Sequence, residues 1–243
     1  GLLVFASYDD LSKNGRFDKA TGNPRPYHYP NHTTPYVSYG VKNNCTSASP
    51  SCNIYSAYRN VDHRSGTALF WVKRDPVIKN ELRIKGDPKK TYKDANSFKY
   101  ETLFWTPGLQ VYRFPDWSDK PGYVQVIYQE AFGDGPYGPR QVITIPYSKK
   151  EQYEWTHWAV SWDVKRKHLM VYKNGKQVGA APATGRPWYA FPWDLGGLSG
   201  GWDLIINSMD HGRKCATLRD EVYIYDRPLS ANQIMKNMQK AKK

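Results

Sequence analysis

Three segments in the middle of the chain alternate apolar side chains with Arg, Lys, Gln and Tyr. They read "ELRIKG" (81–86), "LQVYRF" (109–114) and "YVQVIYQE" (123–130). Side chains two positions apart on a strand share a face. The polar side chains that this spacing gathers are Arg83, Lys85, Gln110, Tyr112, Tyr123 and Gln125. Such a face suits the binding of carboxylates, and its alternative is an ordinary solvated sheet face.

These residue types suit the cleavage of a uronate-containing polysaccharide by β-elimination. The reaction removes the proton beside a carboxylate, so that carboxylate must first be neutralised by hydrogen bonds and positive charge. A base then takes the proton and an acid protonates the leaving oxygen. We predict carboxylate binding by Arg83, Lys85, Gln110 and Gln125. We predict base and acid from among Tyr112, Tyr123 and His211, with Arg213 nearby.

Two loop-like segments add candidates at the margin of this face. "NSMDHGRKC" (207–215) holds His211 and Arg213 together with a glycine, directly after a predicted strand. "AYRNVDHRSG" (57–66) contributes Arg59 as a substrate-binding residue on the other side of the groove. His157 lies inside a strand pattern and is expected to be packed. The paired carboxylates of a glycoside hydrolase strand, in the spacing E-x-D-x-x-E, do not occur.

The charge balance points to an anionic partner. The 35 Lys and Arg against 22 Asp and Glu give 35 − 22 = +13. An excess of this size attracts nucleic acid, anionic membranes or acidic polysaccharides, and it also favours simple solubility. No apolar run reaches the length of a membrane span. Nucleic-acid-binding patterns are lacking too. We therefore expect an acidic polysaccharide as partner, no nucleic acid, and a monomer.

Strand signals bounded by Gly, Pro, Asn or Asp dominate the chain. Helical periodicity is confined to "SANQIMKNMQKAKK", which Ser230 would cap. Many short strands without βαβ alternation predict an all-β fold, a two-sheet antiparallel β-sandwich of the jelly-roll kind with a short C-terminal helix. We expect one domain over 1–243, excised from a longer protein because the sequence lacks a starting Met. The predicted strands are 67–75, 80–86, 100–105, 109–114, 123–130, 140–147, 156–163, 168–175, 202–208 and 220–226.

Three stretches resemble laminin-G-like members of the concanavalin A-like jelly-roll superfamily. They are "GTALFWVKRD" (66–75), "YEWTHWAVSWDVKRKHLMVYKNGKQVG" (153–179) and "DEVYIYDRPLSANQI" (220–234). Members of that superfamily include carbohydrate-binding modules, adhesion modules, glycoside hydrolases and polysaccharide lyases. The resemblance therefore implies the fold, and it implies that a ligand lies across the concave sheet or its rim. Function must be argued from the site.

The resemblance also implies a structural Ca²⁺ held by Asp10, Asp220 and carbonyl oxygens, because first and last strands pair in such jelly rolls. The alternative is that these acids cap turns; no cofactor is needed for the chemistry. Cys45 and Cys52 close a short loop and are expected to form a disulfide. Two N-x-[ST] sequons fit a place outside the cell or on a particle or cell surface.

Two functions from different classes follow. The first is a polysaccharide lyase that acts on a glucuronate-type polymer in a basic groove. The second is a non-catalytic laminin-G-like module that binds acidic or sulfated glycans through the same surface. Release of unsaturated uronate distinguishes the two.

Overall fold

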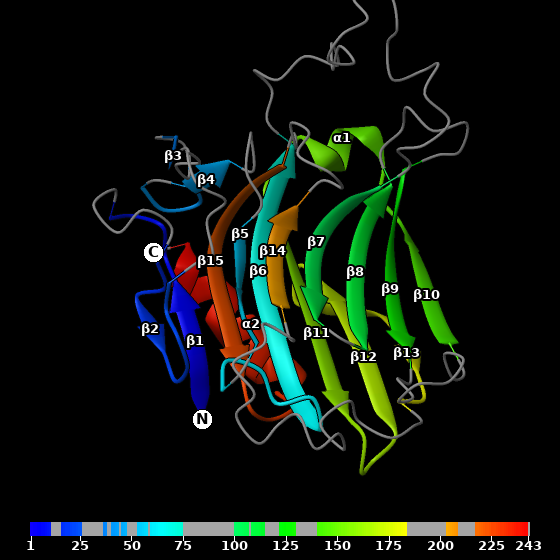
Figure 1. Cartoon of the computed structure of the whole chain (residues 1–243). Helices are drawn as coiled ribbons and strands as arrows, with labels where there is room; N and C mark the ends of the chain where they lie inside the picture. Colours follow the sequence, from blue (N-terminus) through cyan, green and yellow to red (C-terminus); the bar gives the residue numbers. More distant parts are fainter. Residues whose placement is uncertain are drawn as a thin grey trace, which may run out of the picture.

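Two antiparallel sheets packed face to face form the core of the computed structural model, as the alternating strands predict (Figure 1). The structure describes residues 1–10, 16–25, 36–37, 40–43, 45–47, 53–57, 59–74, 100–106, 108–114, 122–129, 140–183, 203–208 and 217–242. The predicted strand 80–86 and Cys52 lie outside these residues, so that strand and the Cys45–Cys52 disulfide stay predictions. Cys45 itself is buried.

The nine-stranded sheet has β15 at its centre, between β6 and the first strand of the chain. Its main order is β13-β12-β11-β6-β15-β1-β2, and β4 joins the side of β15 together with β3. The strands are β1 (Leu2–Ala6), β2 (Lys19–Ala20), β3 (Tyr36–Val37), β4 (Cys45–Ser47), β6 (Ser65–Arg74), β11 (Thr156–Asp163), β12 (His168–Lys173), β13 (Lys176–Ala181) and β15 (Thr217–Tyr225).

The six-stranded sheet faces it with the order β10-β9-β8-β7-β14-β5. Its strands β7 to β10 follow one another as hairpin-connected neighbours, so their register is local. The strands are β5 (Asn53–Ser56), β7 (Glu101–Thr106), β8 (Leu109–Phe114), β9 (Tyr123–Gln129), β10 (Arg140–Pro146) and β14 (Asp203–Ser208).

Each sheet sends alternate side chains into a shared apolar core. Val111 and Val126 of one sheet pack into the same cluster as Val160 and Ile224 of the other. The tyrosines of β15 point the opposite way, as the alternation predicts. Tyr223 and Tyr225 lie in a second cluster under the C-terminal helix. The nine-stranded sheet is therefore covered on both faces.

Helix α2 (Ala231–Ala241) begins at the predicted cap, Ser230, whose hydroxyl accepts from the Gln233 N–H in a capping box. Its buried residues are Ile234, Met238 and Ala241, and the last two pack with Trp71. Helical periodicity predicts this helix alone, whereas the structure has a second one. This short helix, α1 (Lys149–Gln152), begins with a capping box formed by Ser148 and Glu151.

One further difference concerns a strand. The segment "KNGKQV" is expected to supply a turn, with Asn174-Gly175 as a hairpin signal. The structure has that hairpin, and its second strand is β13 (Lys176–Ala181), which is not among the predicted strands. The prediction that the first and last strands pair is confirmed, because Ala6 of β1 lies opposite Val222 of β15. Among the described helices none is long and apolar enough to cross a bilayer.

Candidate functional site

The outer face of the six-stranded sheet carries side chains in rows that cross its strands. Cross-strand partners share a face, so the register of β7 to β10 defines each row. Successive rows are about 7 Å apart, two residues along a strand. The first row runs Tyr100, Phe114, Tyr123, Pro146; the second Thr102, Tyr112, Gln125, Thr144; the third Trp105, Gln110, Ile127, Val142.

Three rings of the first row are in continuous contact, and we call Tyr100, Phe114 and Tyr123 the aromatic row. Phe114 and Tyr123 stack with centroids 4.4 Å apart and planes at 14°. The ring of Tyr100 lies 5.6 Å from Phe114 and 4.5 Å from Tyr112. Tyr100 is 37% exposed. A half-exposed ridge of rings on a sheet surface offers apolar surface to a ligand, although Phe114 and Tyr123 turn one flat face toward each other.

The second row, which we call the polar row, lines this ridge with hydrogen-bonding groups. The Tyr112 hydroxyl donates to Gln110 Oε1 at 2.9 Å, and Gln125 Nε2 donates to Thr144 Oγ1 at 3.3 Å. These bonds orient the two amides. Gln110, Tyr112 and Gln125 are half-buried and Thr144 is exposed. The amide groups of Gln110 and Gln125 and the hydroxyl of Thr144 therefore lie beside the rings.

The structure brings together four of the predicted site residues, since Gln110, Tyr112, Tyr123 and Gln125 share this face as the alternation predicts. Arg59 lies elsewhere. It is exposed in a turn after β5, at the end of the sheet where β7 ends. Tyr100 and Tyr123 lie at the opposite end. The remaining predicted residues, Arg83, Lys85, His211 and Arg213, lie outside the described residues.

A buried ion pair holds the strand that carries Tyr112 and Phe114. Arg113 points inward between the sheets, where its Nε donates to Glu101 Oε2 at 2.6 Å. The same carboxylate accepts from the Thr217 hydroxyl of β15 at 2.8 Å. Both charged side chains are fully buried. This network ties β7, β8 and the nine-stranded sheet together directly beneath the aromatic row.

Sequence reasoning missed part of this site. Phe114 continues the spacing of Gln110 and Tyr112, so the alternation alone was sufficient to find it. Trp105 was hidden by an irregularity between Thr102 and Phe104, which shifts the register of β7 against β8. Such a bulge turns the following side chains to the other face, and periodicity cannot anticipate it.

The predicted metal ligands lie near a bulge in β15. Asp220 is buried, and its carboxylate accepts from the backbone N–H groups of Val41 at 2.6 Å and Glu221 at 2.8 Å. Burial raises the pKa of Asp220 to about 8, and the nearby Glu221 charge adds to this. Burial raises the pKa of Glu221 too, with the charge of Asp9 as a further cause.

Carboxylate oxygens short of compensating positive charge are the donors that Ca²⁺ takes, so the residues fit such an ion chemically. Within the described part of the chain no three His, Cys, Asp or Glu side chains form a metal-binding group. Asp10 is exposed just beyond β1. A Ca²⁺ held by Asp10, Asp220 and carbonyl oxygens stays a prediction.

His157 is packed, as expected for a strand residue. Its ring is buried against Trp71, with ring centroids 5.2 Å apart. Its backbone N–H donates to Asn174 Oδ1 at 3.0 Å. Burial lowers its pKa to about 3, and the charge of Lys242 lowers it further. These contacts belong to the turn under α2 and not to the outer face.

Solved structures with the same fold cover nearly the whole chain. The binding domain of Paraclostridial Mosquitocidal Protein 1 matches 98% of it at 13% identity with a TM-score of 0.62. The botulinum neurotoxin serotype D binding domain matches 98% at 12% identity with a TM-score of 0.59. This chain spans 52% and 51% of those two domains, about half of each.

A third structure is matched along nearly all of its own length. Domain 4 of AbnA, an extracellular arabinanase from Geobacillus stearothermophilus, was solved in complex with arabinotriose. It covers 98% of this chain and 98% of its own, at 17% identity with a TM-score of 0.53. Identities this low show the shared fold alone.

No curated protein sequence matches the chain. The family of the chain is shown instead by a family model. Residues 47–235, well over half of the chain, match the Laminin_G_3 family. This range contains both sheets' central strands and the start of α2. The chain belongs to the laminin-G-like branch of the concanavalin A-like lectin/glucanases superfamily.

Proposed function

We propose that this domain is a non-catalytic module that binds a glycan along the aromatic row. The observation that carries the proposal is the uninterrupted contact from Tyr100 through Phe114 to Tyr123 on a half-exposed sheet face. The apolar C–H surfaces of sugar rings pack on aromatic side chains. The row needs no loop to order itself on binding, because rigid strands carry it.

The orientation of the glycan follows from the rows. The first row crosses β7 to β10, about 14 Å at a strand spacing of about 4.8 Å. A chain lying across the strands would pack against the exposed parts of the rings and direct its hydroxyls at Gln125 and Thr144 of the polar row. Specificity would come from those groups, since hydrogen bonds discriminate between sugars better than apolar area does.

The nature of the glycan rests on charge. The excess of +13 favours an acidic polysaccharide. We place the activity outside the cell or on a particle surface, and treat the module as a monomer with a structural Ca²⁺. The arabinotriose bound in domain 4 of the arabinanase is in keeping with a sugar ligand for this fold.

Lyase chemistry takes second place. Tyr112 and Tyr123 do share a face with Gln125, as β-elimination requires. However, the Tyr112 hydroxyl donates a hydrogen bond to the amide oxygen of Gln110. It would have to leave this partner before it could act on a bound sugar. The binding module needs no such rearrangement.

Titration calorimetry with polyglucuronate, alginate, heparin and arabinan tests the proposal. We expect at least one polymer to bind, and Phe114→Ala and Tyr123→Ala each to weaken it about tenfold or more. Val142→Ala is the matched control, because Val142 is exposed on the same face but lies outside the aromatic row. Its affinity should stay within about twofold of the wild type.

Two results would overturn the binding module. One is that no polymer binds, or that both ring variants keep full affinity with an unchanged circular dichroism spectrum. The other is ultraviolet absorbance from unsaturated uronate that rises with the wild type and is lost in Tyr112→Phe, which would establish the lyase instead.

A further inference from the structure

Exposed cations gather at the end of the nine-stranded sheet that is opposite to α1. They come from three elements: the segment before β6, the β11–β12 connection and the segment after β15. We call the set the basic rim. Its members are Arg64, Lys165, Arg166, Lys167 and Arg227.

Backbone contacts fix these segments beside one another. The Val164 N–H donates to the Arg64 carbonyl at 2.8 Å, which joins the β11–β12 connection to the start of β6. The Ser65 hydroxyl donates to the Asp226 carbonyl at 2.9 Å, and Thr67 Oγ1 donates to the Arg227 carbonyl at 2.9 Å. Arg64 is therefore central, with the lysines on one side and Arg227 on the other.

Two of the acids interspersed in this region are already engaged. Asp62 accepts from Arg64 Nη2 at 3.0 Å, and Asp163 lies 3.6 Å from Arg166 Nε. Within the described residues no ion pair engages Lys165, Lys167 or Arg227. The side chains of Arg64 and Arg166 are 63% and 72% exposed despite their pairs.

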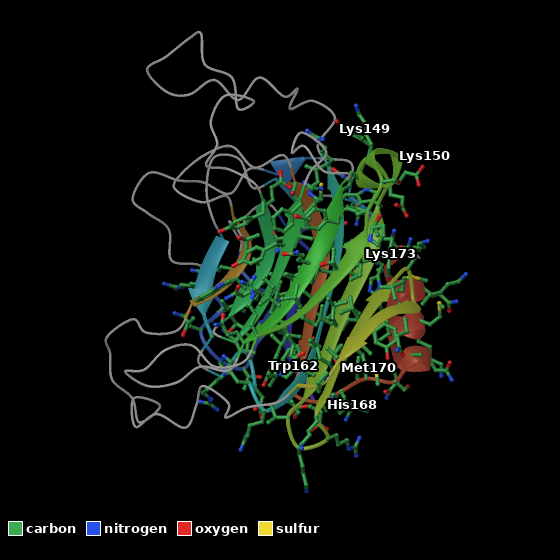
Figure 2. All side chains as sticks on the ribbon, turned by 90° about the vertical axis from the view of Figure 1, so that its right-hand side faces the viewer. Lys149, Lys150, Trp162, His168, Met170 and Lys173 are labelled. Carbon is green, nitrogen blue, oxygen red and sulfur yellow. The ribbon has the colours of Figure 1, made fainter. Side chains whose placement is uncertain are left out.

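The rim lies at the far end of the molecule from the aromatic row. Figure 2 shows Lys149 and Lys150 of α1 at one end, and His168, the first residue of β12, at the other. Tyr123 pairs with Pro146, which precedes α1, so the aromatic row belongs to the α1 end. Arg59, predicted to bind substrate, lies in the turn that leads into Asp62 and Arg64. The rim is therefore a second surface, and its argument does not depend on the aromatic row.

The rim is charged and holds no large exposed apolar side chain, and this bears on the class of its partner. Membrane insertion needs exposed apolar side chains, and single-stranded nucleic acid is held largely by aromatic stacking. The large exposed hydrophobic residues of the described chain are Tyr100, Val142 and Val178, and none belongs to the rim. Cations alternating with engaged acids instead suit charges spaced along a polar polymer.

We propose that the basic rim binds the sulfate or carboxylate groups of an acidic polysaccharide. Lys165, Lys167 and Arg227 supply the charges that their own neighbours leave unneutralised, and Arg64 and Arg166 exchange part of their contacts with Asp62 and Asp163 for the polymer. Binding of this kind releases counterions and weakens steeply with salt.

A charge-matched pair of triple variants tests the rim, with heparin as the probe. The rim variant is Lys165→Gln, Lys167→Gln and Arg227→Gln. The control, Lys176→Gln, Lys236→Gln and Lys240→Gln, removes the same charge from exposed positions of β13 and α2. Affinity is measured by calorimetry at several NaCl concentrations, and retention on heparin-agarose supports it.

We expect the rim variant to bind heparin at least about tenfold more weakly, with a slope of log affinity against log salt about two smaller. The control should keep both the slope and the affinity within about twofold. Phe114→Ala should leave this slope unchanged, so loss of the aromatic-row proposal and loss of the rim proposal give different signatures.

The proposal is overturned if both triple variants weaken equally, since net charge alone then explains binding. It is overturned also if the rim variant binds heparin as the wild type does. Phosphatidylserine vesicles and single-stranded DNA serve as further probes. A larger loss with either of these than with heparin would assign the rim to that other polyanion and refute the polysaccharide.

Discussion

Phe114 and Tyr123 lie opposite each other on β8 and β9 and stack almost in parallel, with centroids 4.4 Å apart. The neighbouring residue of β8, Arg113, is locked inside the sandwich by Glu101. The stacked rings on the surface are thus next in sequence to a buried ion pair. The ion pair holds the backbone of β8 in place, and the two rings hold each other by stacking.

The stack should be measurable as a coupling energy. Stacked ring pairs contribute about 1 kcal/mol beyond their buried area. We expect a double-mutant cycle of Phe114→Ala and Tyr123→Ala, followed by urea unfolding, to give a coupling of that order. The pair Phe114→Ala and Val142→Ala serves as control, and a coupling as large there would show that the effect is not due to stacking.

Removing the negative charge of Glu101 from the buried ion pair should lower the stability of the fold. Glu101→Gln leaves Arg113 buried without its counter-charge, which lowers the free energy of unfolding by about 3–5 kcal/mol. The exposed Glu154→Gln should change it by less than about 0.5 kcal/mol. Equilibrium denaturation compares the two. Equal small effects would mean that the pair does not hold β7 and β8 in register.

The central strands of the six-stranded sheet were predictable because one face is buried and the other is not. In 109–114 the period of two correctly separates Gln110 and Tyr112 from Val111 and Arg113. The strand β13 escaped prediction because Gly179 and two alanines weaken its pattern. A Cβ at Gly179 would run into Ile143, so a glycine is required where the sheets approach closely.

The site was only partly predictable for a different reason. The sequence identifies which residues share a face of one strand, but the alignment between strands comes from turns and bulges. The gathering of Arg64 with Arg227 needed the tertiary fold, since 162 positions separate Thr67 from Leu229, the residues that join these segments. The composition shows an excess of positive charge, but it does not show where on the surface that charge lies.

Asp220 should make the fold lose stability as pH rises. Its folded pKa of about 8 exceeds the ordinary value of 3.8, so the folded state holds a proton that the unfolded state releases between these values. The free energy of unfolding then falls by up to about 1.4 kcal/mol per pH unit. Asp220→Asn should flatten this decline between pH 6.5 and 8 in denaturation series with EDTA, whereas Glu154→Gln should not. An unchanged slope in Asp220→Asn would contradict the assignment.

His157 should act with the opposite sign on the acid side. Its folded pKa of about 3 lies below the ordinary 6.5, so the unfolded state binds the extra proton and acid favours unfolding between these values. His157→Phe keeps a ring against Trp71 and should make the loss of stability from pH 6 to 4 shallower. The exposed His168→Phe should leave it as in the wild type. Equal slopes in all three proteins would exclude His157 as the cause.

The predicted Ca²⁺ can be tested by thermal unfolding. A ligand that binds only the folded state raises the melting temperature, by an amount that grows with the logarithm of its free concentration above Kd. We expect Ca²⁺ to raise it relative to EDTA, Mg²⁺ to do so much less, and Asp10→Asn to reduce the effect. No shift at millimolar Ca²⁺ would rule out the ion.

The place of β15 bears on how the chain is made. This strand lies between β6 and β1, and the Asp226 N–H just after it donates to the Gly1 carbonyl at 3.1 Å. A growing chain that lacks residues 217–225 leaves β6 and β1 without the strand that connects them. The nine-stranded sheet therefore assembles late and slowly, after this strand is synthesised. Until then its apolar strand edges are unpaired and exposed to aggregation.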